Sequence, residues 1–302
     1  MGGTDFRAEV RDLKRRRNAV ILAHNYQLPE IQDAADFVGD SLELSRRAAA
    51  LKAEVIVFCG VRFMAETAAV LAPGKTVILP EPRAGCPMAD MITARELRGW
   101  RDELRGRPVI CYVNTSAEVK AESDICCTSS NAVAVVDSLP EGEVLFVPDR
   151  NLAAWVARET GRAVVAWDGC CYVHDKFRPA DILEKKALHP AAEVWVHPEC
   201  RMDVIDLADK VLSTGKMVAE ARVTKSPEVI IGTEKEILHR LRKENPAVSF
   251  FAAREGALCA NMKMTTPDKV LAALRGGVPA VTVPADVADR ARGAIEAMLR
   301  IS

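Results

Sequence analysis

The sequence predicts an α/β protein of three similar three-layer αβα domains, whose parallel sheets surround a pseudo-threefold axis and a central cavity. Three observations lead to this: a segment that occurs three times, strand-like and helix-like stretches that alternate, and one cysteine that follows each repeat. With 302 residues, 49% of them hydrophobic, the chain is long enough for two or three domains. The expected domains are residues 1–85, 86–170 and 171–261, with residues 262–302 packing back on the first.

The repeated segment has six residues, begins with Asp and ends with Ser or Thr. Its copies are residues 36–41, 124–129 and 209–214, so it recurs after 88 and then 85 residues. Upstream of each copy an apolar run ends in polar residues, at residues 21–26, 109–114 and 194–199. A second apolar run follows each copy, at residues 55–60, 144–149 and 229–233. Three sets in one register predict three similar domains rather than a chance match.

Stretches with helical spacing lie between these apolar runs, for example at residues 43–52, 153–159 and 234–243. Strands that alternate with helices imply parallel sheets with helices on both faces. In such units ligands bind beyond the carboxyl ends of the strands, where helix N-termini also point. The polar residues expected at these ends, and hence in one central cavity, are His24, Tyr26, Ser41, Tyr112, Asn114, Ser129, His197, Glu199 and Thr214.

The balance of charge argues against two classes of partner. Lys and Arg total 41 and Asp and Glu total 42, so no overall field attracts nucleic acid or an anionic membrane. The basic residues 11–17 are expected on the solvated face of a first helix. The apolar residues 19–23 are too few for a signal peptide, and no later run is long enough to span a bilayer. We therefore expect a cytoplasmic protein with no nucleic-acid or membrane partner.

The nine cysteines point to metal binding, because cytosolic thiols are kept reduced and rarely form a disulfide framework. Cys86, Cys171 and Cys259 are 85 and then 88 residues apart, so the threefold symmetry would bring them together. Three thiolates can hold three corners of a 4Fe-4S cluster and leave one iron open. A zinc site that recruits His174 is the alternative. Cys170, which precedes Cys171, fits the spacing equally well.

Several short motifs follow one another in a fixed order. They occupy residues 24–26, 39–41, 112–114, 127–131, 167–174, 197–200, 213–215, 259 and 262–263. In this order they resemble the quinolinate synthase family over nearly the whole chain. The resemblance implies condensation of iminoaspartate with dihydroxyacetone phosphate to quinolinate, phosphate and water in NAD biosynthesis. It also implies a 4Fe-4S cluster on Cys86, Cys171 and Cys259 with one open iron, and functional coupling to an enzyme that supplies unstable iminoaspartate.

The roles of the polar residues follow from this chemistry. His197 and Glu199 flank Pro198, so their side chains point to one side of an extended segment, and His24 and Tyr26 share that spacing. We assign Glu199 as the general base, with the other three as further candidates for proton transfer. Substrate contacts are expected from His24, Ser41, Tyr112, Asn114, Ser129, His174, His197, Glu199, Ser213 and Thr214. For Ser41, Ser129, Ser213 and Thr214, helix capping is an alternative that does not exclude anion binding.

Two other classes of function are alternatives. One is a non-catalytic iron-sulfur sensor or carrier, in which the cluster itself is the functional output. The other is a zinc-dependent lyase or hydrolase. A sensor would carry a partner surface or a nucleic-acid patch, whereas this chain directs its polar residues into a cavity. Metal analysis would distinguish zinc from iron.

Overall fold

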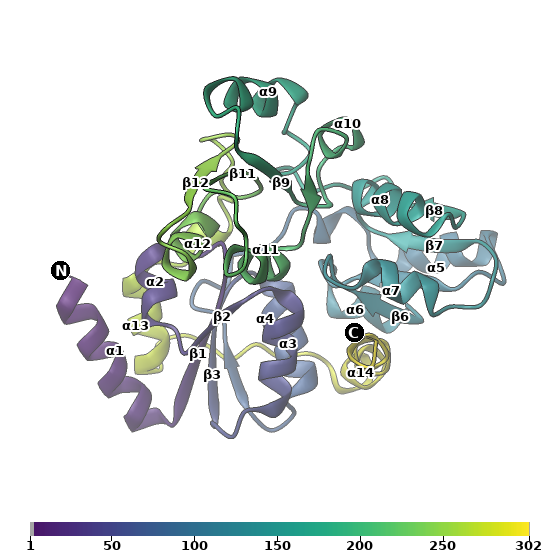
Figure 1. Ribbon diagram of the computed structural model, residues 1–302. Helices are drawn as coiled ribbons and strands as arrows, with labels where there is room; N and C mark the ends of the chain where they lie inside the picture. The colour runs from purple at the N-terminus through teal and green to yellow at the C-terminus, as the bar shows by residue number, and fades with distance from the viewer. Residues whose placement is uncertain (1–2, 302) are drawn as a thin grey trace.

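The computed structural model describes residues 3–301 and contains three parallel sheets of four strands with the same strand order. The first sheet runs β2 (Phe37–Gly39), β1 (Ala19–His24), β3 (Val55–Cys59) and β4 (Thr76–Ile78). The second runs β6 (Ile125–Cys127), β5 (Val109–Tyr112), β7 (Val144–Val147) and β8 (Val164–Ala166). The third runs β10 (Lys210–Val211), β9 (Glu193–Val196), β11 (Glu228–Gly232) and β12 (Ser249–Ala252). The predicted fold class is confirmed (Figure 1).

Helices connect the strands of each sheet. The first repeat contains α1 (Gly3–Arg17), α2 (Pro29–Ala34), α3 (Ser41–Ala50) and α4 (Arg62–Leu71). The second contains α5 (Ala94–Glu103), α6 (Ala117–Ala121), α7 (Ala132–Asp137) and α8 (Arg150–Thr160). The third contains α9 (Pro179–Leu188), α10 (Met202–Ile205), α11 (Thr214–Ala221) and α12 (Ile237–Glu244), and α13 (Pro267–Arg275) and α14 (Ala285–Leu299) follow. Within residues 3–301 no helix is long and apolar enough to cross a membrane.

The aspartate that begins each repeated segment ties the second strand of its sheet to the first. In every repeat its carboxylate accepts the N–H of a residue in the first strand, and its own N–H donates to the carbonyl of that residue. The pairs are Ile21–Asp36, Val109–Asp124 and Val194–Asp209, with N–H to carboxylate distances of 2.8, 2.8 and 2.7 Å. This contact fixes the register of the two strands. The Ser or Thr that ends each segment therefore lies at the carboxyl side of the sheet.

The C-terminal residues are divided between two sheets. α13 packs on α1 and β3 of the first sheet, whereas α14 packs mainly on α6 and β6 of the second and also contacts α4 (Figure 1). Of residues 262–302, α13 therefore packs on the first domain as expected, whereas α14 divides its contacts between the second domain and α4 of the first. The buried apolar residues of α14, which include Ala291, Ile295 and Met298, complete the core beside α6. The domain boundaries themselves stay a prediction, and residues 1, 2 and 302 lie outside the described part.

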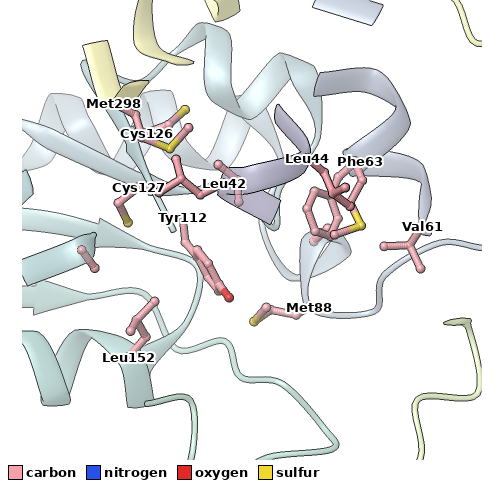
Figure 2. Packing of buried hydrophobic residues seen from close by; sticks show 14 of the residues in the cluster. Leu42, Leu44, Val61, Phe63, Met88, Tyr112, Cys126, Cys127, Leu152 and Met298 are labelled. Atoms are coloured by element: carbon pink, nitrogen blue, oxygen red, sulfur yellow. The ribbon is translucent and has the colours of Figure 1, made fainter. Parts of the chain in front are cut away.

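One apolar cluster crosses from repeat to repeat. It contains Leu42 and Phe63 of the first repeat, Cys126 and Cys127 of the second, and Met298 of α14 (Figure 2). Trp195 and Phe250 of the third repeat belong to the same cluster. Because separating the repeats would expose this apolar surface to water, the hydrophobic effect holds the three sheets together around the axis.

Candidate active site

A cavity is lined by residues that follow the carboxyl ends of strands in all three sheets. Concave sites of this kind, with polar groups that converge from several elements, are where small molecules bind. The expected site residues that line it are His24, Tyr26, Ser41, Cys86, Tyr112, Asn114, Ser129, Cys171, His174, His197, Glu199, Thr214 and Cys259. The structure thus brings together every predicted site residue except Ser213.

Two histidines occupy equivalent strand ends and are held in one tautomer. The Nδ1 atom of His24 accepts the N–H of Tyr26 at 3.2 Å, and the Nδ1 atom of His197 accepts the N–H of Glu199 at 3.3 Å. A neutral imidazole that accepts at Nδ1 carries its proton on Nε2. Each ring therefore has an Nε2–H group free to donate to another partner.

The same two histidines are uncharged near neutral pH. Burial, together with the neighbouring Lys263, lowers the pKa of His24 to about 3. Burial and the adjacent His174 likewise lower the pKa of His197 to about 3. Since both values lie far below 7, these rings are neutral hydrogen-bond donors rather than cations.

With Asp40, the cap of α3, Glu199 is one of two buried carboxylates among the described residues that line the cavity, and 3% of its surface is exposed. Its Oε1 accepts the Tyr112 hydroxyl at 2.6 Å, and its Oε2 lies 2.6 Å from Nδ1 of His174. Burial alone would raise the pKa of Glu199, but His174, His197 and the Tyr112 hydroxyl together hold it below its ordinary value. Glu199 is therefore ionised, and it lines the same cavity as the neutral rings of His24 and His197.

Thr233 links this carboxylate to Tyr26, and the sequence analysis did not identify it. Its Oγ1 lies 2.5 Å from the Tyr26 hydroxyl and 2.8 Å from Nε2 of His174. A continuous series of hydrogen bonds therefore runs from Tyr26 through Thr233 and His174 to Glu199. The only sequence signal for Thr233 is its place directly after a strand, β11.

The first residues of α3 and α11 face the cavity because the residues before them do the capping. Asp40 caps α3 in a capping box, and Ser213 caps α11. Ser41 and Thr214, which begin the two helices, are cavity-lining residues. Ser213 does not line the cavity. Its Oγ accepts the N–H of Lys216 and lies 2.7 Å from the hydroxyl of Ser130. Its expected contact with substrate stays a prediction.

The three cysteines at the repeat spacing belong to equivalent loops. In each loop the cysteine carbonyl accepts the N–H of the residue four positions later, at 3.3 Å for Cys86, 2.8 Å for Cys171 and 3.2 Å for Cys259. The Tyr172 hydroxyl lies 3.7 Å from the Cys259 sulfur. Cys170 is not among the described residues that line the cavity. The geometry therefore favours Cys171 over Cys170 as the third thiol.

A family model described as quinolinate synthetase A protein matches residues 8–300. The chain belongs to this family. It is 58% identical over 293 residues to quinolinate synthase from Dehalococcoides mccartyi strain CBDB1 and covers 97% of both chains. It is 56% identical over 293 residues to quinolinate synthase from Methanoregula boonei, again covering 97% of both chains. Quinolinate synthase 1 from Methanosarcina acetivorans is 48% identical over 301 residues, which are 100% of this chain and 99% of that protein.

The resemblance predicted from the motifs is thereby confirmed, and so is the expectation that the chain is an enzyme of the quinolinate synthase type. The motif positions are also where the structure builds its cavity. Figure 2 shows the Tyr112 hydroxyl directed toward Met88, and both residues line the cavity. Cys126 and Cys127 instead pack among apolar side chains (Figure 2).

The donor set of this quinolinate synthetase A chain fits an iron-sulfur cluster. Three thiols from equivalent loops face one cavity, and thiolates are the ligands that hold iron-sulfur clusters. A mononuclear metal has a different set of donors, because ligand atoms of Cys171, His174 and Glu199 all lie within 4.8 Å of one another. That second set uses one of the three cysteines and has the mixed ligands that zinc accepts.

Proposed function

We propose that the chain condenses iminoaspartate with dihydroxyacetone phosphate to give quinolinate, phosphate and water in NAD biosynthesis. The observation that carries this proposal is a single cavity that combines three thiols, several neutral donors and the ionised carboxylate of Glu199. The names of the relatives support the same activity. We further propose a cytoplasmic location and coupling to the enzyme that supplies iminoaspartate.

A 4Fe-4S cluster is part of the proposal, with Cys86, Cys171 and Cys259 as its ligands. When bound, such a cluster supplies one open iron that acts as a Lewis acid. The chain's own contribution is to hold three thiols at equivalent places on the axis. A non-catalytic sensor or carrier would not need the polar residues that line the rest of the cavity.

The substrates carry carboxylates and a phosphate, and the cavity supplies neutral groups that bind anions. The Nε2–H groups of His24 and His197 donate without bringing a positive charge. The N-termini of α3 and α11 add backbone N–H groups beside Ser41 and Thr214. Asn114 supports the same role, because its Oδ1 is buried without a hydrogen-bond partner among residues 3–301. We assign this oxygen as an acceptor for a substrate N–H or O–H.

Cyclisation and loss of water require a group that removes protons, and we assign this role to Glu199. The carboxylate is already ionised, so it can accept a proton from bound substrate. Its donors, Tyr112 and His174, keep its pKa low in the free protein. A substrate that displaces one of these donors raises the pKa of Glu199 toward the pH at which a base works best.

The hydrogen-bond series from Tyr26 to Glu199 gives the abstracted proton a route across the cavity. Burial raises the pKa of Tyr26 well above its ordinary value, so its hydroxyl keeps its proton at neutral pH and can donate it in a hydrogen bond. Thr233 and His174 connect that hydroxyl with the base. Tyr26 can thus deliver a proton to a leaving group while Glu199 removes one elsewhere on the substrate.

An anaerobic spectrum followed by an activity assay tests the proposed function. We expect iron-sulfur absorption in protein purified without oxygen, and formation of quinolinate only when both substrates are present. Protein that carries the cluster but forms no quinolinate would overturn the reaction and leave the cluster in place. Protein that forms quinolinate with no iron would overturn the cluster.

A zinc-dependent lyase or hydrolase is the second candidate, and the close grouping of Cys171, His174 and Glu199 favours it. In such an enzyme the metal would occupy the place of the hydrogen bond between His174 and Glu199. Metal analysis of the same preparation decides between the two, because zinc at one equivalent with no sulfide supports the second candidate alone.

A further inference from the structure

The loops that carry the three cavity cysteines are anchored by the same backbone hydrogen bond. In each repeat the N–H of the third residue after β3, β7 or β11 donates to the carbonyl two residues before the cysteine. The bonds run from Arg62 to Ala84, from Arg150 to Gly169 and from Lys235 to Ala257, at 2.8, 2.8 and 2.9 Å. The backbone around the cysteines therefore follows the threefold symmetry.

The side chains that precede these donors break the symmetry. The equivalent residues are Val61, Asp149 and Glu234. Asp149 Oδ2 accepts the N–H of Cys171 at 3.1 Å, and Glu234 Oε1 accepts the N–H of Cys259 at 3.2 Å. Val61 has no polar atom with which to hold the third loop. Two of the three cysteines thus have a carboxylate on their own backbone N–H, and Cys86 does not.

Both carboxylates are fully buried, with 0% of their surface exposed. Burial raises the pKa of both side chains, and the backbone N–H groups that donate to their oxygens oppose this shift. Asp149 Oδ1 accepts the N–H of Leu152 at 2.8 Å, and Glu234 Oε2 accepts the N–H of Glu236 at 2.9 Å. Each carboxylate therefore bridges the end of a strand and a cysteine loop that follows it by 22 or 25 residues.

We propose that Asp149 and Glu234 are positioning residues that hold Cys171 and Cys259 in the geometry that binds the cluster. This inference rests on the proposed function, because it assumes the cluster. It assigns the two buried carboxylates a role in retaining that cluster. A carboxylate suits the task because both of its oxygens accept hydrogen bonds. Groups that orient metal ligands in this way typically contribute about tenfold to a hundredfold to metal affinity.

Asp149→Asn is the variant that isolates the contact with Cys171. Asparagine caps a helix about as well as aspartate, so its oxygen can keep the bond to Leu152 that begins α8. Its amide NH₂ then faces the N–H of Cys171, and two donors repel each other. Glu234→Gln places the same conflict at Cys259, although it also weakens the contact between Glu234 and Lys263 at 2.7 Å.

Glu66→Gln is the matched control. Glu66 is also a buried carboxylate, with 7% of its surface exposed, and it accepts the N–H of Ala117 at 3.2 Å. Its other oxygen accepts a hydrogen bond from the Arg62 side chain at 2.8 Å, and neither oxygen accepts the N–H of a cavity cysteine. The same change of carboxylate to amide therefore tests burial and charge without the contact with a cysteine. Comparison with this variant separates a general loss of stability from a specific effect on the cysteines.

The experiment measures iron loss to a chelator after anaerobic reconstitution, together with thermal unfolding of the cluster-free proteins. We expect Asp149→Asn and Glu234→Gln to lose iron at least about tenfold faster than wild type and Glu66→Gln. Equal rates in all four proteins would overturn the positioning role and leave the cluster intact. Faster loss in Glu66→Gln as well, in step with lower unfolding temperatures, would also overturn it. Wild-type protein that takes up no cluster would overturn the proposed function and this inference together.

Discussion

The two ends of the three sheets differ in how closely their side chains follow the internal symmetry. At the amino ends of β2, β6 and β10, one aspartate makes the same contact in every repeat. At the carboxyl ends of β1, β5 and β9, the equivalent pairs are His24 and Tyr26, Tyr112 and Asn114, and His197 and Glu199. The contact that forms the sheet is the same three times, whereas the residues that face the cavity differ. The contacts that are the same in all three repeats therefore determine the fold. The residues that differ among the repeats suit the chemistry of an asymmetric substrate.

The cavity cysteines are the exception to this division. They face the cavity, yet the same residue type occurs in all three repeats with the same surrounding backbone. Three identical side chains suit a ligand that presents equivalent corners, as the proposed cubic cluster does. The polar strand ends, which differ among the repeats, suit an asymmetric ligand.

The largest expected effect comes from the cysteines. Cys86→Ala, Cys171→Ala and Cys259→Ala should each abolish iron-sulfur absorption, because a cubane with two protein ligands loses a second corner to solvent. Cys126→Ala, Cys170→Ala and Cys200→Ala should retain it. Absorption spectra and iron analysis of anaerobic protein test this. Full iron content in Cys171→Ala, with loss in Cys170→Ala, would contradict the assignment.

The next effect concerns a residue that differs among the repeats. Glu199→Gln keeps the shape of the side chain and an acceptor for Tyr112 but removes the group that takes a proton. Loss of a positioned base costs about a hundred-fold to ten-thousand-fold in rate, so turnover should fall by at least about a hundred-fold. Cluster content and quinolinate affinity should persist. Near wild-type turnover would remove Glu199 from proton transfer and move the role to His197 or Tyr26.

Thr233→Val is expected to lower turnover less than Glu199→Gln does. It removes the hydroxyl between Tyr26 and His174, which are otherwise 3.5 Å apart, without changing the size of the side chain. Loss of one buried hydrogen bond is worth roughly tenfold in rate if it forms part of the proton route. Thr233→Ser should restore most of the turnover. Thr265→Val, which removes a buried hydroxyl without a partner among the described residues, is the control and should leave turnover unchanged.

The sequence predicted the features of the fold and the site that depend on the spacing of residues along the chain. The repeat spacing predicted the three sheets and the strand ends that face the cavity, because symmetry converts equal spacing into equal placement. It also predicted one cavity cysteine after each repeat but did not distinguish Cys171 from Cys170. It did not identify Thr233, whose contact with Tyr26 joins residues 207 positions apart. Such contacts depend on how the repeats pack, as does the docking of α14 on the second sheet. The neutral state of His24 likewise follows from burial, which the spacing does not encode.

The smallest effect is expected at the symmetric end of the sheets. Asp209 is the clearest test, because Asp36 and Asp124 also form ion pairs, with Lys14 and Arg101 respectively. In Asp209→Ala the N–H of Val194 loses its acceptor at the exposed end of β10, which should lower the free energy of unfolding by about 1 kcal/mol.

Turnover of the folded Asp209→Ala protein should stay within about twofold of wild type, because Thr214 is held independently at the start of α11. Its hydroxyl accepts a hydrogen bond at 3.0 Å from Asn25 of the first repeat, and that bond does not pass through Asp209. Denaturant unfolding and turnover per cluster, measured on one preparation, test the two statements separately. A fall in turnover much larger than the loss of stability would mean that the register set by Asp209 governs the cavity directly. The two ends of the sheet would then act as one unit, and the division between a symmetric scaffold and an asymmetric site would be wrong.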